Sequence, residues 1–191
     1  MGGVVRRRRA SRTPRWQRGS DGSKLTAVRF RVEHEFPGAR DAVADILCDP
    51  AFHTRLELPD LSRPEVVEQS ATGTERILRL RYEFVGHLDP IARRILAGRR
   101  LTWIQELRLD IATYVGSLSF AAEAEADRLH GSADVTLEAL DGARTRRRVA
   151  GALFVRVPVV GGTAERRIVP GLVRRLDVEA DALTAALAAA G

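Results

Sequence analysis

The sequence predicts an α+β domain in which a curved antiparallel sheet of about seven strands wraps around a long C-terminal helix. Three observations support this fold class. Residues 162–190 carry leucines at the spacing of one helix face, whereas most segments between residues 64 and 157 alternate apolar and polar side chains. The elements also follow in the order of one strand, two short helices, six strands and a final helix. Because strands and helices are segregated along the chain, the helices are expected to cover one face of the sheet.

The N-terminal strand is predicted over residues 25–36, which read LTAVRFRVEHEF. Inward and charged residues alternate along this strand, so that one face carries Val28, Phe30, Val32, His34 and Phe36. Residues 39–48 then have apolar side chains at helical spacing and stop before Asp49-Pro50. A second short helix is expected from residue 51 to about residue 56.

The sheet continues in six segments with period-two alternation, which are residues 64–71, 74–85, 100–110, 113–122, 129–138 and 143–157, the last being the longest. Such alternation predicts a sheet that is covered on one face and wet on the other. Gly116, Gly131 and Gly151 lie mid-strand, where we expect the sheet to bend. Residues 89–97, between the second and third segments, predict a short helix with Asp89 as its N-cap.

The final helix is predicted to face the sheet through Leu172, Leu176 and Leu183. The dipeptide Pro170-Gly171 falls inside it, where a proline removes a backbone donor and costs about 3 kcal/mol. We therefore expect either a bend at this dipeptide or a break, with the main helix starting at the proline.

Charged side chains of the same helix are assigned to its solvated side, and they are Arg166, Arg167, Arg174, Arg175, Glu179 and Asp181. Arg147 shares its strand face with the inward-facing Val149, which conflicts with its charge. We expect Arg147 to lie at the open end of the strand, where the guanidinium reaches water.

The net charge of +6 is concentrated at the N-terminus. Residues 1–24 hold eight basic side chains and one acidic one, which leaves 23 basic and 24 acidic side chains in the rest of the chain. Residues 1–23 lack apolar periodicity, so they predict a disordered arginine-rich tail before one folded domain over residues 24–191. The near-neutral domain gives no reason to expect a specific nucleic-acid partner. Peripheral membrane contact stays open through the tail or through residues 89–100.

The lone Cys48 and four scattered histidines predict neither a disulfide nor a metal site, and no motif indicates a cofactor. No run approaches the roughly 18 apolar residues of a membrane span. A single cysteine in a chain without a span fits a reducing, cytoplasmic location. No feature of the sequence specifies an oligomeric state.

Five segments carry a resemblance to a known superfamily: FRVEHEFPG, DPAFHTRLELPDLS, LRYEFVGHLDPIARR, RLTWIQE and VRVPVVGGTAERRIVPGLVRRLDVEADAL. Residues 30–187 as a whole resemble the START-like, helix-grip (SRPBCC) superfamily, which includes polyketide cyclases, lipid-transfer domains and pathogenesis-related plant allergens. Within it, the five segments are similar to an uncharacterised actinobacterial family. The resemblance implies a helix-grip fold with a pocket for a hydrophobic ligand.

We therefore expect a cavity between the sheet and the C-terminal helix that binds an apolar small molecule such as a lipid, an isoprenoid or a polyketide. The absence of a catalytic motif favours a non-catalytic carrier or sensor. Candidate ligand-binding residues come from the inward strand faces, the second short helix and the final helix, and they are His34, His53, Tyr82, Phe84, Trp103, Gln105, Tyr114, Leu118, Phe120, Leu172, Leu176 and Leu183.

Two alternatives stay open. A cyclase- or hydrolase-like enzyme would use Tyr82, His34 or His53, since cyclases of the superfamily mostly work through pocket shape with Arg, Tyr or His and need no motif. An interaction domain would instead fill the pocket with its own aromatic side chains, which are Tyr82, Phe84, Trp103 and Phe120. Some candidates also have a plain structural interpretation: His53 as a capping or surface residue, and Cys48 as a small buried residue.

Overall fold

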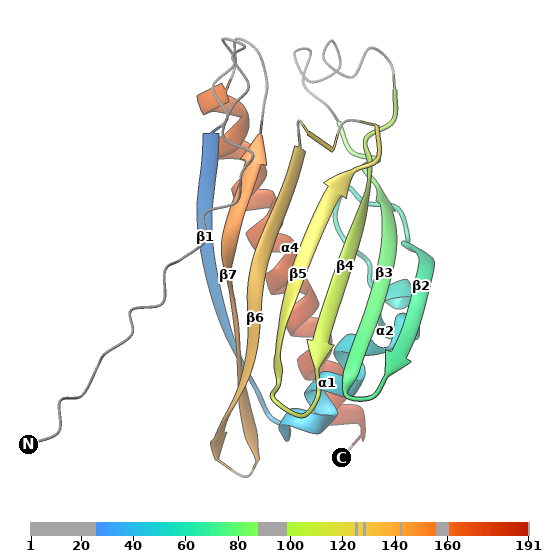
Figure 1. Cartoon of the computed structure of the whole chain (residues 1–191), viewed down its shortest axis with the longest axis vertical. Helices are drawn as coiled ribbons and strands as arrows, with labels where there is room; N and C mark the ends of the chain where they lie inside the picture. Colours follow the sequence, from blue (N-terminus) through green and yellow to red (C-terminus); the bar gives the residue numbers. More distant parts are fainter. Residues whose placement is uncertain are drawn as a thin grey trace, which may run out of the picture.

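A computed structural model describes residues 26–87, 99–124, 126–127, 129–141, 143–155 and 161–190. The described residues form one seven-stranded antiparallel sheet and three helices (Figure 1). The predicted α+β class and the predicted order of strand, two helices, six strands and helix are confirmed. The tail over residues 1–23 and the helix over residues 89–97 lie outside the described residues.

Strand β1 (Thr26–Phe36) is followed by helices α1 (Arg40–Cys48) and α2 (Pro50–Arg55). The later elements are β2 (Glu65–Thr72), β3 (Glu75–Glu83), β4 (Thr102–Asp110), β5 (Val115–Ala122), β6 (Leu129–Asp141), β7 (Arg144–Val155) and α4 (Gly161–Ala190). The strand order is β1-β7-β6-β5-β4-β3-β2, so β2 to β7 form a meander and β1 pairs with the last strand. Strand β6 has 13 residues, and β7 has 12 up to Val155, where the described residues stop.

The boundary between α1 and α2 follows from the dipeptide Asp49-Pro50. The side chain of Asp49 accepts a hydrogen bond of 2.8 Å from the amide of Ala51, and the proline occupies the first position of α2. Val43 and Leu47 of α1 are buried against the rest of the core. The two short helices therefore close one end of the space between the sheet and α4.

Two glycines lie where the backbones of neighbouring strands approach closely. A Cβ atom on Gly151 would lie 2.1 Å from the carbonyl oxygen of Ser132, and one on Gly131 would lie 2.4 Å from the ring of Phe120. A side chain fits at neither position without a shift of its neighbours. The curvature of the sheet therefore depends on residues that the sequence places mid-strand.

Helix α4 runs behind the strands along much of their length in Figure 1. It is a single helix that includes Pro170, so the alternative of a break at this residue is wrong, and the alternative of a bend stays a prediction. Pro170 is exposed, and water can therefore hydrate the carbonyl that loses its amide donor. None of the helices among the described residues is both long and apolar enough to cross a bilayer.

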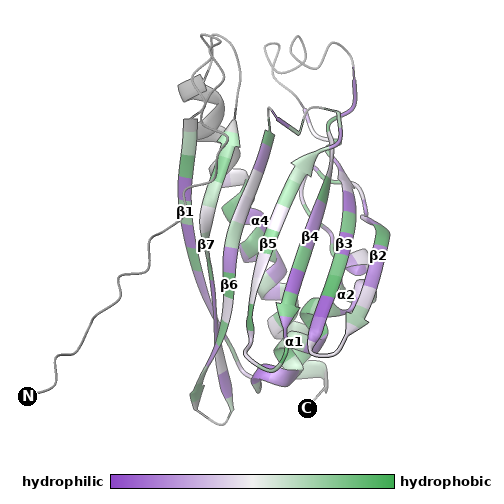
Figure 2. Cartoon of the chain, in the orientation of Figure 1, coloured by the Kyte–Doolittle hydropathy of each residue, from purple (hydrophilic) through white to green (hydrophobic). Residues whose placement is uncertain are grey.

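The core lies between α1, α4 and the inner face of the sheet. Its most deeply buried aliphatic side chains include Leu78, Leu80, Leu109, Val149 and Leu183. Hydrophilic and hydrophobic residues alternate along several strands (Figure 2), because successive side chains point to opposite faces of the sheet. The charges of the outer face pair across strands: Arg148 contacts Glu33 at 2.9 Å and Glu138 at 2.8 Å. These two pairs hold β1, β7 and β6 in register on the wet side of the sheet.

Candidate functional site

A group of polar side chains lies inside the fold, between the sheet and α4. We call it the interior polar cluster, and its members are His34, His53, Tyr82, Gln105, Arg147, Arg175 and Glu179. Buried polar groups of this kind are expensive unless each finds a partner, so their contacts decide what the interior can bind.

One half of the cluster is an ion pair between β7 and α4. Arg147 donates to the carboxylate of Glu179 over 2.5 Å, and the side chains are only 3% and 6% exposed. Burial by itself raises the pKa of Glu179, but the charges of Arg147, His53 and Arg175, together with the hydrogen bond from Arg147, hold that pKa below its usual value. Glu179 is therefore a carboxylate in the folded protein.

His34 connects this ion pair to the surface. Its Nδ1 lies 3.3 Å from Nη2 of Arg147, and its Nε2 lies 2.9 Å from a carboxylate oxygen of Asp177. A guanidinium nitrogen can only donate, so Nδ1 accepts and Nε2 carries the proton that is donated to Asp177. Contacts on both ring nitrogens fix the orientation of the His34 ring.

The other half of the cluster is built around Arg175. Its Nη1 donates to the side-chain oxygen of Gln105, and its guanidinium carbon lies 4.4 Å from the ring centre of Tyr82. Tyr82 in turn stacks with Trp103, with ring centres 5.7 Å apart. The Tyr82 side chain is fully buried, and burial raises its pKa, so the hydroxyl stays protonated.

His53 lies next to these charges and is 2% exposed, which corrects the prediction of a surface residue, whereas the capping alternative agrees with its contact to Leu47 in the last turn of α1. Its Nε2 is 2.8 Å from the carbonyl oxygen of Leu47, so this nitrogen donates and the ring is fixed in one tautomer. Burial lowers the pKa of His53. The charge of Glu179 raises this pKa, and the charges of Arg175 and Arg147 lower it.

Several buried polar atoms of the cluster lack a hydrogen-bond partner among the protein atoms, and they are Nδ1 of His53, Oη of Tyr82, Nε of Arg147, and Nε and Nη2 of Arg175. Unpartnered donors and acceptors of this kind are rare in native interiors. Their number in one region indicates a place where a ligand or water supplies the missing contacts.

The aliphatic and aromatic candidates fall into two groups. Leu176 and Leu183 are fully enclosed in the core. The incompletely covered candidates are Phe84, Trp103, Leu118, Phe120 and Leu172, of which Trp103, Leu118 and Leu172 pack against the core. These incompletely covered side chains surround the part of the inner face that contains Tyr82 and Gln105.

Tyr114 does not join the other candidates. It lies in the β4–β5 turn with a φ of 57°, not in a strand as predicted. Its hydroxyl donates to Asp41, and Arg40 sits 4.3 Å from its ring centre. The hydrogen bond to Asp41 and burial raise the pKa of Tyr114. This tyrosine connects the turn to α1. It lies at the opposite end of the β4–β5 pair from Trp103.

Sequence reasoning missed the charged members of the cluster. Arg175 and Glu179 are 8% and 5% exposed, although the predicted helix face assigned both to solvent. Arg147 is 2% exposed within the strand and not at its open end. The available signal was spacing: Arg175 and Glu179 are four residues apart on the face that carries Leu176 and Leu183.

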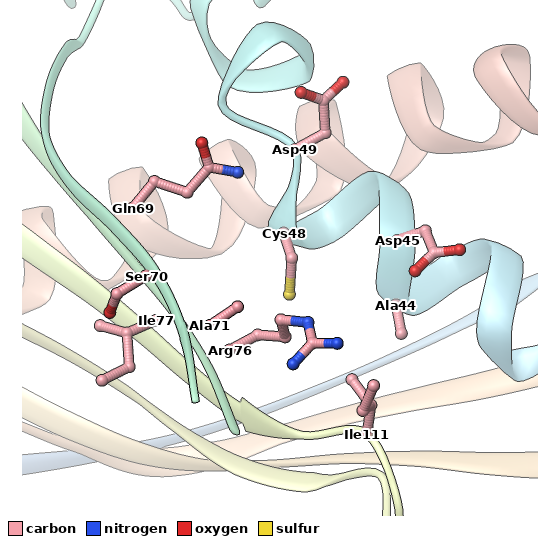
Figure 3. A pocket seen from close by; sticks show the side chains of 10 residues that line it. All are labelled: Ala44, Asp45, Cys48, Asp49, Gln69, Ser70, Ala71, Arg76, Ile77 and Ile111. Carbon is pink, nitrogen blue, oxygen red and sulfur yellow. The ribbon is translucent and has the colours of Figure 1, made fainter. Parts of the chain in front are cut away.

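A separate pocket of about 390 Å³ lies between α1 and the β2–β3 hairpin (Figure 3). Its lining includes Cys48, Asp45, Gln69 and Arg76, and the sulfur of Cys48 points toward Arg76 in Figure 3. Burial raises the pKa of Cys48 to about 11, so this thiol is a poor nucleophile near neutral pH. None of the predicted ligand-binding residues lines this pocket.

A second, shallower hollow of about 700 Å³ lies on β1, β5, β6 and β7, and its lining includes Arg29, Ser132, Ala152 and Phe154. It too is lined by none of the predicted ligand-binding residues. In the part of the chain that the structure describes, no three His, Cys, Asp or Glu side chains group closely enough to hold a metal ion.

Comparisons with known proteins agree with this architecture. The family model described as "Protein of unknown function (DUF2505)" matches residues 31–187. No curated protein matches the chain. Among solved structures, the Zhui aromatase/cyclase from Streptomyces sp. R1128 is similar at 19% identity, with a TM-score of 0.56 over 84% of this chain and 93% of that one.

Norcoclaurine synthase from Thalictrum flavum is similar at 16% identity, with a TM-score of 0.59 over 94% of this chain and 98% of that one. Its complex with dopamine and hydroxybenzaldehyde matches at 14% identity, with a TM-score of 0.56 over 85% and 87% of the two chains. At these identities the likeness shows the fold: a START-like, polyketide-cyclase-like helix-grip fold, as the sequence resemblance implied.

Proposed function

We propose that this chain, which belongs to the DUF2505 family of proteins of unknown function, binds a hydrophobic small molecule between its sheet and helix α4 and acts as a carrier or sensor. The observation that carries this proposal is the incomplete coverage of the apolar inner face around Trp103. A contiguous group of incompletely covered apolar side chains is a feature of ligand-binding grooves.

The two ends of the inner face differ in how well they are filled. Near α1, Leu78, Leu109 and Leu183 are buried almost completely. Toward the end of the sheet that contains Trp103, the inward-facing Phe120 and Leu172 keep part of their surface exposed. The arrangement favours a ligand over the alternative of an interaction domain with a filled interior, because Phe84, Trp103 and Phe120 are not sealed.

The size and nature of a ligand follow from these surroundings. Aromatic and aliphatic side chains with a few convergent polar groups are typical of small-molecule sites. One similar structure holds dopamine and hydroxybenzaldehyde, which supports a ligand with an aromatic body. Lipids, isoprenoids and polyketides remain within the same class of apolar molecules. A cytoplasmic location is part of this proposal, since the chain has one cysteine.

Titration with N-phenyl-1-naphthylamine, an uncharged apolar fluorophore, tests the proposal. We expect saturable fluorescence enhancement with a dissociation constant on the order of micromolar. Leu118→Trp fills the inner face and is expected to abolish the enhancement. Val115→Trp is the matched control, because Val115 begins the same strand and is 51% exposed. Native mass spectrometry of protein purified without detergent should in addition show a non-covalent adduct.

A chain that never enhances the fluorophore and carries no adduct under mild ionisation contradicts the proposal. Equal binding by the Leu118→Trp and Val115→Trp proteins would place the binding elsewhere, and the pocket of Figure 3 would then be the next surface to examine. Far-ultraviolet circular dichroism checks that both variants fold.

A second candidate function is a cyclase-like enzyme, and one observation favours it. The hydroxyl of Tyr82 and Nδ1 of His53 are both buried without a protein partner, as expected of groups that exchange protons with a bound substrate. Tyr82→Phe would then abolish turnover of an aromatic or polyketide substrate without weakening binding. Binding of such substrates without conversion over a broad panel supports the carrier instead.

A further inference from the structure

We propose that the ligand carries a carboxylate group and that Arg175 binds this group. The inference rests on the proposed function and names the chemical class of the molecule that occupies the same site. It is carried by the contacts of one buried guanidinium.

Arg175 is a buried charge without a direct ion-pair partner among the described residues. Its side chain extends from α4 to the sheet, and the residue is 8% exposed. Its hydrogen-bond partner is the neutral amide of Gln105, and its guanidinium stacks over the ring of Tyr82. Among the described residues, no carboxylate lies within ion-pair distance of it. A buried charge normally requires a counter-ion, because the interior solvates it poorly.

The buried acid that acts on Arg175 is already engaged. Glu179 acts on Arg175 electrostatically, but its carboxylate is bound by Arg147 at 2.5 Å. The two guanidiniums thus share one buried carboxylate, and the interior polar cluster retains one excess positive charge. Asp177 reaches only His34 at the surface and is more than half exposed. An anion from outside the chain would balance this charge.

The unpartnered atoms of Arg175 specify the shape of that anion. They are Nε and Nη2, whose N–H bonds point in the same direction on one edge of the guanidinium. This edge is the fork that binds both oxygens of a carboxylate. Gln105 occupies the opposite nitrogen and fixes the orientation of the fork. The geometry therefore favours a planar, two-oxygen group.

Tyr82 completes the recognition of such a group. Its hydroxyl is buried, makes no hydrogen bond of good geometry, and lies close enough to Arg175 for that guanidinium to lower its pKa against the larger effect of burial. Burial raises the pKa of Tyr82, so the hydroxyl is a donor and adds to the two N–H donors of Arg175. Trp103 lies two residues before Gln105 on β4, and Phe120 lies opposite Gln105 on β5. Both would contact the apolar body of the ligand.

Calorimetric titration of the full chain with 2-naphthoate and with its uncharged analogue 2-naphthylmethanol tests the inference. The carboxylate is expected to bind about 10- to 100-fold more tightly than the alcohol, the range for a charge-assisted hydrogen-bond pair. Arg175→Met should remove this preference and leave the affinity for the alcohol similar. Arg174→Met is the matched control, because Arg174 is the exposed neighbour on the same helix.

Gln105→Glu provides a second readout that does not depend on losing Arg175. The new carboxylate would pair with Arg175 inside the protein, so we expect weaker 2-naphthoate binding together with a higher midpoint of thermal unfolding without ligand. A merely structural role for Arg175 would not predict both changes.

The outcomes separate the two proposals. Binding of 2-naphthylmethanol as tight as that of 2-naphthoate, with no loss of 2-naphthoate affinity in Arg175→Met, overturns the carboxylate inference and leaves the hydrophobic site intact. Binding of neither compound overturns both. Loss of 2-naphthoate affinity in Arg174→Met as large as in Arg175→Met would show a surface charge effect and also overturn the inference.

Discussion

The carboxylate of Glu179 on α4 lies 2.5 Å from the guanidinium of Arg147 on β7, and less than one tenth of either side chain is exposed. The pair joins α4 to β7, the strand that pairs with β1. Two charges in the interior cost desolvation free energy, and their attraction repays it only while both are present. Removal of one partner alone therefore leaves an uncompensated charge buried under the helix.

Glu179→Gln is expected to lower the free energy of unfolding by about 3–5 kcal/mol, because the amide leaves the buried Arg147 without a counter-ion. The double variant Arg147→Met with Glu179→Gln should be more stable than Glu179→Gln alone. Urea denaturation followed by circular dichroism measures both. Asp181→Asn, at an exposed position of the same helix, should change stability by less than about 0.5 kcal/mol. Equal stability of Glu179→Gln and Asp181→Asn would contradict the buried pair.

Stability should fall on acidification as His53 becomes protonated in the unfolded chain. Burial lowers the pKa of this ring from 6.5 in the folded protein, so its contribution is complete above pH 6.5 and is lost as the pH falls below that value. The pKa of Glu179 is also lowered, and its contribution is lost only below its usual value of 4.5. The slope between these values should be positive and at most about 1.4 kcal/mol per pH unit, the value for one proton.

His53→Gln tests this assignment, because glutamine can still donate to the carbonyl of Leu47 but does not titrate. The slope of unfolding free energy against pH should be flatter in this variant from about pH 6.5 to pH 5. His87→Gln serves as the control at an exposed position and should keep the slope of the parent protein. An unchanged slope in His53→Gln would assign the effect to another group.

A comparison of two buried hydroxyls tests whether the interior is built for stability or for a ligand. Thr145 donates to the carbonyl of Gly38 over 2.7 Å, whereas the hydroxyl of Tyr82 has no partner. Thr145→Val should therefore lower the unfolding free energy of the ligand-free protein by about 1–2 kcal/mol. Tyr82→Phe should leave it unchanged or raise it, since no hydrogen bond is lost. A loss of comparable size in Tyr82→Phe would indicate an internal partner for the hydroxyl and weaken the ligand proposal.

The fold could be predicted from the sequence because local patterns determine it. Period-two alternation located the strands, helical spacing located α4, and Asp49-Pro50 marked the boundary between the two short helices. Each of these signals acts within about ten residues of chain. The strand order in the sheet, in which β1 pairs with β7, was not predicted from the sequence.

The charged half of the site could not be predicted in the same way. Arg147 and Glu179 are 32 residues apart, and Arg175 and Gln105 are 70 residues apart. A charged residue on an otherwise apolar face is assigned to solvent unless its partner is known, and the partner lies on another element. The aromatic and amide candidates were easier, because Tyr82, Trp103 and Gln105 follow from strand alternation alone.

Two glycine substitutions should have opposite effects on stability. Gly151→Ala adds a Cβ atom that would lie 2.1 Å from the carbonyl oxygen of Ser132 and 2.5 Å from the Cα of Ala133, both in the neighbouring strand β6. Backbone atoms cannot move aside without bending the sheet, so a loss of about 1–3 kcal/mol or more is expected. The Cβ atom of Gly171→Ala meets nothing within 4 Å at an exposed position of α4, so the variant should gain about 0.5–1 kcal/mol. Urea unfolding of the two variants measures this contrast. A stabilising Gly151→Ala would mean that the sheet is flatter at this point, and the space between sheet and α4 would then need another origin.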